Sequence, residues 1–166
     1  MSDESQPPSH GRHRYRLIAD VVQVLLRPNG FALCVRRTAT SPVAPLQLTL
    51  VGGHLEPGES LDQAARREAR EETGVHVDAS HQEFCGLVHY NDPLGEDRIT
   101  AVFVAQSWAG EPYNAEPDKH DGLFWVDMEQ PSPDCHPYTV AIFRMLTEGP
   151  SYVALNWPSC EEEGVS

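Results

Sequence analysis

Three carboxylates crowd into five residues of the sequence, at Glu68, Glu71 and Glu72 in the stretch GHLEPGESLDQAARREAREETGV. Side chains three and four residues apart on a helix are neighbours, and like charges at that spacing repel one another. Carboxylate oxygens are hard ligands that suit Mg²⁺ or Mn²⁺, and these cations keep coordination positions for water and phosphate oxygens. The spacing therefore indicates a divalent-cation site that handles a phosphate group.

A helical projection places two of these acids on the side of the helix that should face the core. With Leu61 at zero and about 100° per residue, Glu68 falls at about −20° and Glu72 at about +20°. Ala65 marks the same apolar stripe, and Glu71 lies at its edge. A buried carboxylate without a partner is strongly unfavourable, so this face favours a bound cation. From the spacing alone, a solvated helix with alternating Glu and Arg stays open as the alternative.

The helix that carries the cluster is predicted at about residues 61–73. Ser60 followed three residues later by Gln63 is a capping-box pattern, which starts a helix. Gly74 suits the left-handed conformation that ends one. Local signals thus fix both ends of the element that positions the acids.

Residues 53–75 resemble the signature of the Nudix hydrolases, G-x5-E-x7-R-E-U-x-E-E-x-G-U, in which U is an apolar residue. Every fixed position is met, and Ala69 is a small occupant of the first apolar position. Many members have proline where this chain has Val51. The resemblance implies an α/β fold, a Nudix-type α/β/α sandwich with a mixed β-sheet between helices.

The resemblance also implies the roles of individual residues. The implied metal ligands all offer oxygen, and they are the carbonyl of Gly53 and the carboxylates of Glu68, Glu71, Glu72 and Glu116. The same carboxylates, together with Arg67, are the implied catalytic residues, and Glu68 in some members helps to deprotonate the attacking water. Glu59 and Arg67 resemble the ion pair that fixes the loop against the helix, and Gly74 is a structural position of the motif.

Two segments outside the motif are similar to the MutT-like branch of the family. GEPYNAEPDK resembles the segment whose late glutamate, here Glu116, is a further ligand or base; an ordinary loop acid is the alternative. VRR resembles the end of a strand where a basic side chain contacts phosphate, so Arg37 or Arg36 is a candidate, with a plain surface pair as the alternative. Residues 133–138, PDCHPY, do not match the asparagine that reads an oxidised purine in MutT, and that substrate is not predicted.

The elements around the motif predict one domain with several strands and a second helix. Two apolar runs joined by Pro28-Asn29-Gly30 predict a β-hairpin over residues 14–37. The further predicted strands are QLTLV, EFCGLVHY, RITAVFVAQSW and LFWVDM, and the second helix is PYTVAIFRMLTEG. We expect a flexible tail at 1–13, the Nudix hydrolase domain at 14–157 and an acidic tail at 158–166.

Composition narrows the classes of protein. The net charge of −13 over 166 residues argues against a general nucleic-acid binder, which needs a basic patch. No apolar run is long enough to span a membrane, and residues 1–15 lack the apolar core of a signal peptide, so we expect a cytoplasmic protein. Cys34 and Cys85 lie in apolar runs and are expected to be buried, reduced thiols.

The resemblance implies hydrolysis of a diphosphate linkage in a nucleoside triphosphate or related nucleotide, with Mg²⁺ as cofactor and Mn²⁺ as a substitute. A nucleotide sugar, ADP-ribose or a non-nucleotide diphosphate is the alternative substrate. A Nudix-derived sensor that binds nucleotides without cleaving them is the alternative from another class. The partner is a small molecule, with no nucleic acid or membrane, and a homodimer is an assembly that the family allows.

Overall fold

The computed structural model describes residues 14–157, so the predicted tails lie outside the described residues. The strands are β1 Ile18–Leu25, β2 Phe31–Arg37, β3 Leu48–Leu50, β4 Gly52–His54, β5 Gln82–Asn91, β6 Asp97–Ala105, β7 His120–Asp127 and β8 Tyr152–Leu155. The helices are α1 Leu61–Thr73 and α2 Pro137–Glu148, with a short 3₁₀ turn η1 at Ala79–His81. The predicted helices are therefore present at the predicted places.

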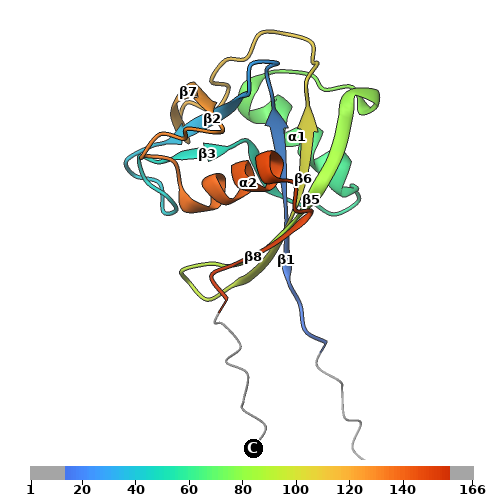
Figure 1. Cartoon of the computed structure of the whole chain (residues 1–166), viewed down its shortest axis with the longest axis vertical. Coiled ribbons are helices and arrows are strands. Elements are labelled where there is room, and N and C mark those ends of the chain that lie inside the picture. Colours follow the sequence, from blue (N-terminus) through green and yellow to red (C-terminus); the bar gives the residue numbers. More distant parts are fainter. Residues whose placement is uncertain (1–13, 158–166) are drawn as a thin grey trace, which may run out of the picture.

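The strands form two sheets. The larger sheet has the order β4-β1-β6-β5-β8 and is mixed, because β1 pairs in parallel with β6, β5 runs antiparallel to β6, and β8 is parallel to β5. The smaller sheet, β3-β2-β7, is antiparallel. Figure 1 shows β1, β6 and β5 side by side, with β2, β3 and β7 gathered at one end of them.

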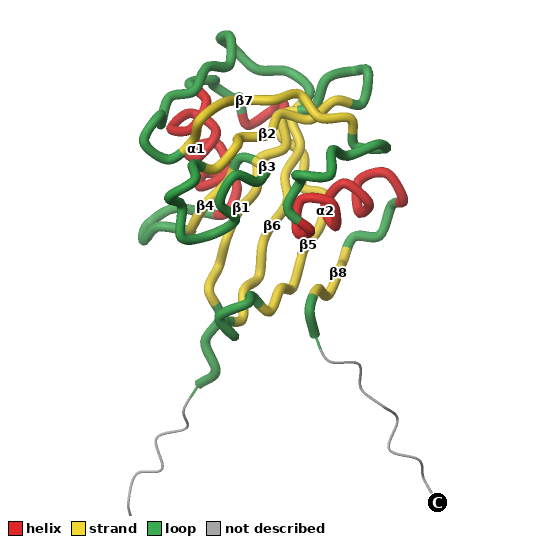
Figure 2. The backbone as a smooth tube through the Cα atoms, turned by 90° about the vertical axis from the view of Figure 1, so that its left-hand side faces the viewer, coloured by secondary structure: helices red, strands yellow, loops and turns green. Residues whose placement is uncertain are grey.

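The two helices cover opposite faces of the larger sheet, as Figure 2 shows. On β1, Val22 and Val24 pack in the cluster that contains Ile142 of α2, whereas Val21 packs with Ala65 of α1. The alternation follows from the two-residue period of a strand, which turns neighbouring side chains to opposite faces. The predicted α/β/α sandwich is confirmed, with a second, smaller sheet added to it.

The predicted hairpin over residues 14–37 is wrong beyond its turn. Pro28-Asn29-Gly30 does form the turn, and Leu26 and Ala32 make a single bridge next to it. Beyond that bridge β1 pairs with β4 and β6, and β2 pairs with β3 and β7. Each strand thus finds two neighbours in its own sheet, which a local turn signal does not reveal.

The cysteine prediction is borne out for Cys34, which is buried, whereas Cys85 is half-buried; both thiols are free. Burial raises the pKa of the Cys34 thiol, so it stays protonated and inert. Within residues 14–157, no helix is both long and apolar enough to cross a membrane.

Candidate metal centre and adjoining pocket

Helix α1 begins after Ser60 and ends before Gly74, the two capping residues that the sequence predicts. The backbone N–H of Ser60 donates to Oε1 of Gln63 at 3.0 Å, and Gly74 has φ 70° with its N–H donating to the carbonyl of Arg70. A β-carbon at Gly74 would lie 2.1 Å from the ring of Tyr113, so only glycine fits there. The helix therefore holds a fixed register against the loops on either side.

Arg67 is the centre of an ion-pair network on α1. Its guanidinium donates to both carboxylate oxygens of Glu59, at 2.9 and 2.8 Å, and to the carbonyl of His54 at 3.0 Å. It also donates to Glu68 at 2.8 Å and to Glu71 at 3.0 Å. The hydrogen bond from Arg67 lowers the pKa of Glu59. The predicted pair of Glu59 and Arg67 is present, and it ties residues 54–59 to the helix.

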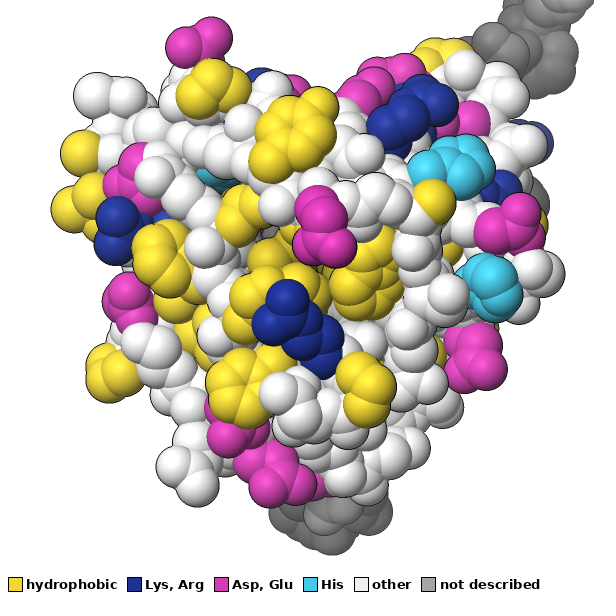
Figure 3. Space-filling view, turned by 90° about the horizontal axis from the view of Figure 1, so that it is seen from above, with side chains coloured by type: hydrophobic (Ala, Val, Ile, Leu, Met, Phe, Trp, Pro, Cys, Tyr) yellow, Lys and Arg dark blue, Asp and Glu magenta, His cyan; other side chains and the backbone are white. Residues whose placement is uncertain are grey.

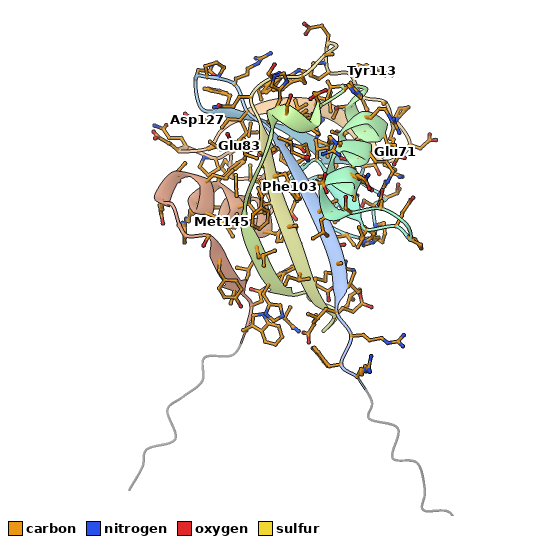
Figure 4. The ribbon with its side chains drawn as sticks, turned by 90° about the vertical axis from the view of Figure 1, so that its right-hand side faces the viewer. Glu71, Glu83, Phe103, Tyr113, Asp127 and Met145 are labelled. Carbon is orange, nitrogen blue, oxygen red and sulfur yellow. The ribbon has the colours of Figure 1, made fainter. Side chains whose placement is uncertain are left out.

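The three glutamates of the cluster lie in different surroundings. Glu71 is exposed and projects from the outer side of α1 (Figure 4). Glu68 is partly buried, and burial raises its pKa above the ordinary value. Glu72 is only 5% exposed, and burial together with the charge of Glu68 raises its pKa from 4.5 to about 8. The helical projection thus places Glu68 and Glu72 correctly on the inward side.

Two glycines bring backbone against these carboxylates. A β-carbon at Gly53 would lie 2.4 Å from Oε1 of Glu68, and one at Gly52 would lie 2.2 Å from the carbonyl oxygen of Val21. The N–H of Gly52 donates to Oε2 of Glu72 at 3.2 Å. The close approach needs residues without side chains, and it sets the predicted ligand Gly53 beside Glu68.

Glu116 reaches the same site from the loop before β7. The N–H of Ala115 donates to the carbonyl of Glu72 at 3.1 Å, which holds this loop against the end of α1. One ligand atom each from Glu72, Glu116 and His120 lies within 4.8 Å of the other two. Lys119 donates to Glu116 at 2.8 Å, so part of the charge of Glu116 is balanced. The predicted acid of the loop and the buried acid of the helix are therefore brought together.

His120 is the residue that sequence reasoning missed. It is fully buried, and neither ring nitrogen has a hydrogen-bond partner among the described residues. Burial, and then the charge of Arg37, lowers its pKa to about 4, so the ring is neutral. Its position four residues after Glu116 gave no signal, because only the pairing of β7 with β2 carries it to the acids.

The donor set fits a divalent cation. Glu72 is buried, and within the described residues its one ion-pair partner is the neutral His120, at 3.7 Å. Carboxylates with oxygen neighbours form the environment that Mg²⁺ and Mn²⁺ prefer. A positive ion at this place would relieve the charge that raises the pKa of Glu72.

A cavity of about 470 Å³ adjoins the centre. Gly52 and Gly53 of β4 form part of its wall, and the loop 41–44 and the start of α2 form others. Arg37 lines this cavity. Arg36 does not: it pairs with Asp121 at 2.6 Å and lies over the ring of Phe124. Of the two candidate phosphate ligands, only Arg37 lies where a phosphate group near the acids could contact it.

The end of the cavity beyond the glycines is polar. Arg98 donates to Asp20 at 2.9 Å and to Asp92 at 3.0 Å, and all three residues line the cavity. Tyr90 and Tyr138 add aromatic rings whose centroids are 5.2 Å apart. Asp20 is an acidic residue within the otherwise apolar strand β1. Such a charge in an apolar run is a sequence signal that could have identified this end of the cavity.

The surface is negatively charged, so an anionic ligand needs positive groups close to its binding site. Acidic side chains surround the hydrophobic groups on the face seen from above in Figure 3, in keeping with the net charge of −13. Such a field repels phosphates, so Arg37 and a bound cation are the groups that could reverse it locally.

Comparisons with known proteins agree on the family. A family model described as NUDIX domain matches residues 15–145. The chain is 38% identical over 58 residues to "Nucleoside triphosphatase NudI" of Enterobacter sp., covering 35% of this chain and 41% of that protein. It is 37% identical over 81 residues to "Oxidized purine nucleoside triphosphate hydrolase" of Danio rerio, covering 48% of each. The chain thus spans less than half the length of these two relatives.

Solved structures share the fold. The MutT NUDIX hydrolase of Burkholderia pseudomallei superposes with a TM-score of 0.70 at 24% identity, over 78% of this chain and 98% of that one. A NUDIX hydrolase of Nitrosomonas europaea gives a TM-score of 0.68 at 22% identity, over 83% and 93%. At these identities the likeness concerns the fold alone.

Proposed function

Because the chain belongs to the NUDIX family, we propose that it hydrolyses a diphosphate linkage in a nucleoside triphosphate with Mg²⁺ as cofactor, for which Mn²⁺ can substitute. The products are a nucleoside monophosphate and pyrophosphate. The observation that carries the proposal is the buried Glu72, whose one ion-pair partner among residues 14–157 is the neutral His120. It lies next to a cavity that shares Gly52 and Gly53 with the acidic centre. The names of the two relatives, both triphosphate hydrolases, support the substrate class.

The residues that would hold the cation are Glu72 and Glu116, with the carbonyl of Gly53, while Glu68 lies beside Gly53. A bound cation would neutralise phosphate charge and lower the pKa of a coordinated water. Glu71 is exposed and its Oε2 pairs with Arg67 at 3.0 Å, so it is the peripheral member of the cluster. The chain therefore offers a buried set of donors and one peripheral carboxylate.

Glu68 is the general base in this proposal. Arg67 donates to its Oε1 and so fixes the carboxyl group, which leaves Oε2 to accept the proton of the attacking water. Burial raises the pKa of Glu68, and a raised pKa makes a carboxylate a better base near neutral pH. Gly53 leaves room for this carboxyl group, since a β-carbon there would lie 2.4 Å from Oε1 of Glu68.

The substrate lies along the cavity, with its phosphates at the glycines and its nucleoside at the polar end. Arg37 binds phosphate oxygens, since it lines the cavity and its charge acts on Glu72. Tyr90 and Tyr138 flank the nucleoside. A volume of about 470 Å³ falls within the range of roughly 300–1,000 Å³ that small-molecule sites have.

Product analysis tests the proposal. The purified chain, with Mg²⁺, is incubated with ordinary and oxidised nucleoside triphosphates, nucleotide sugars and ADP-ribose, and the products are identified by ³¹P NMR. We expect pyrophosphate and a monophosphate from a triphosphate, loss of this activity in Glu72→Gln, and its retention in Glu83→Gln, an exposed acid on β5. Cleavage of the nucleotide sugars or ADP-ribose alone would show that the substrate is one of these compounds and not a nucleoside triphosphate. Cation binding without any cleavage would favour a sensor.

A further inference from the structure

We propose that His120 is a direct ligand of the divalent cation, which gives this centre a nitrogen donor beside its carboxylates. The inference rests on the proposed function in one respect, that the acidic centre takes a divalent cation. It goes beyond that function because the motif implies oxygen ligands only. A mixed donor set changes which cations the centre prefers.

The ring of His120 has no other evident use. The side chain is fully buried, and both of its nitrogens lack hydrogen-bond partners among residues 14–157. A buried polar atom without a partner is unfavourable and is rare in folded proteins. Its Nε2 is directed at Oε1 of Glu72, at 3.7 Å, which is too long for a hydrogen bond.

The distances suit an ion between the groups. Two donors that are each about 2.1 Å from one cation lie about 3 Å apart in adjacent positions and about 4.2 Å apart in opposite positions. The 3.7 Å between His120 and Glu72 falls between these values, and Glu116 supplies a third atom within 4.8 Å of both. One ion can therefore contact all three with small side-chain movements.

Three contacts hold the backbone of His120 in place. The N–H of His120 donates to the carbonyl of Glu116 at 3.0 Å, and its own carbonyl accepts from Nδ2 of Asn114 at 2.7 Å. In the smaller sheet His120 pairs with Arg37. These contacts fix the backbone of His120, and the full burial of the side chain keeps the ring from solvent. They also set it beside the acids before any ion arrives.

A nitrogen donor shifts the selectivity of the centre. Imidazole suits Zn²⁺ and Ni²⁺, whereas Mg²⁺ and Mn²⁺ favour oxygen ligands. We expect His120→Gln to weaken Zn²⁺ binding by about tenfold or more, and Mg²⁺ binding by less than about threefold. The ratio of the two affinities is therefore the quantity to measure.

Pulsed electron paramagnetic resonance tests the ligand directly, without substrate or turnover. The full chain is stripped with EDTA and given half an equivalent of Mn²⁺. We expect electron spin-echo modulation from a directly coordinated ¹⁴N in the wild type and its loss in His120→Gln. It should persist in His81→Gln, which replaces an exposed histidine on η1. Competition of Zn²⁺ and of Mg²⁺ against bound Mn²⁺, read from the continuous-wave signal of the released Mn²⁺, gives the two affinities.

The outcomes separate this inference from the proposed function. A folded wild type that binds Mn²⁺ without ¹⁴N modulation overturns the inference, whatever happens to the variant. Modulation that survives in folded His120→Gln, and disappears in His54→Gln, assigns the nitrogen to His54, which lines the cavity, and also overturns the inference. Modulation lost with His120, in a chain that cleaves no nucleotide, upholds the ligand while the proposed activity fails.

Discussion

Replacing Glu72 by glutamine should remove a large pH dependence from the stability of the metal-free protein. Burial and the charge of Glu68 raise the pKa of Glu72 from 4.5 to about 8. In the unfolded chain this carboxyl group ionises near pH 4.5, whereas in the folded chain it keeps its proton to about pH 8. The folded state therefore binds more protons across this window, and stability falls as pH rises.

The size of the effect follows from the width of the window. Each pH unit within it costs about 1.4 kcal/mol, so the two units from pH 5.5 to pH 7.5 remove about 3 kcal/mol. That is a substantial part of the roughly 5–15 kcal/mol that holds a domain folded. Glutamine resembles the protonated acid and can still accept from the N–H of Gly52, so Glu72→Gln should lack this loss.

Urea unfolding in EDTA at pH 5.5, 6.5 and 7.5 measures the difference. The free energy of unfolding of Glu72→Gln should rise by about 3 kcal/mol relative to the wild type across this range, and Glu83→Gln should follow the wild type. The pKa of His120 is lowered to about 4, so its contribution to stability is lost as pH falls below 6.5. That contribution is common to all three proteins and cancels. Parallel pH profiles, or a variant less stable than the wild type at pH 7.5, would refute the reasoning.

Three further predictions follow from the same contacts. Arg67→Ala should lower the free energy of unfolding by about 3 kcal/mol, because it leaves partly buried carboxylates unpaired, while Arg70→Ala on the exposed side should change it by less than about 0.5 kcal/mol in urea melts. Gly53→Ala should lower kcat at least about tenfold in steady-state assays, since the added methyl group would lie 2.4 Å from a glutamate oxygen of α1; an unchanged kcat would contradict this. Arg37→Gln should raise KM about tenfold and Arg36→Gln should not, so equal effects would be against the assignment of the phosphate ligand.

The parts of the fold that local signals control could be predicted from the sequence. Helix α1 spans the predicted residues because Ser60, Gln63 and Gly74 act on their immediate neighbours. The inward direction of Glu68 and Glu72 follows from helical periodicity, which is equally local. Such features need no knowledge of the distant chain.

The missed parts depend on pairing between distant strands. The Pro28-Asn29-Gly30 turn forms, but β1 and β2 separate because each is completed by strands far along the chain. His120 lies near Glu72 only because β7 pairs with β2. A single histidine at the start of a strand therefore did not indicate a place in the metal centre. The same reason hides Arg98, which reaches Asp20 across the parallel pair of β1 and β6.

The different surroundings of the three glutamates lead us to expect the pH dependence from Glu72 and not from its neighbour Glu71. The three carboxylates do not share one environment: Arg67 pairs with Glu68 and with the exposed Glu71, whereas Glu72 faces the neutral ring of His120. A charge that is exposed and paired changes stability little when it is removed. Glu71→Gln should therefore keep the pH profile of the wild type in EDTA, although it lies one residue from the variant that loses it. If Glu71→Gln flattened the profile as strongly as Glu72→Gln does, the repulsion would belong to the cluster as a whole and not to the buried position.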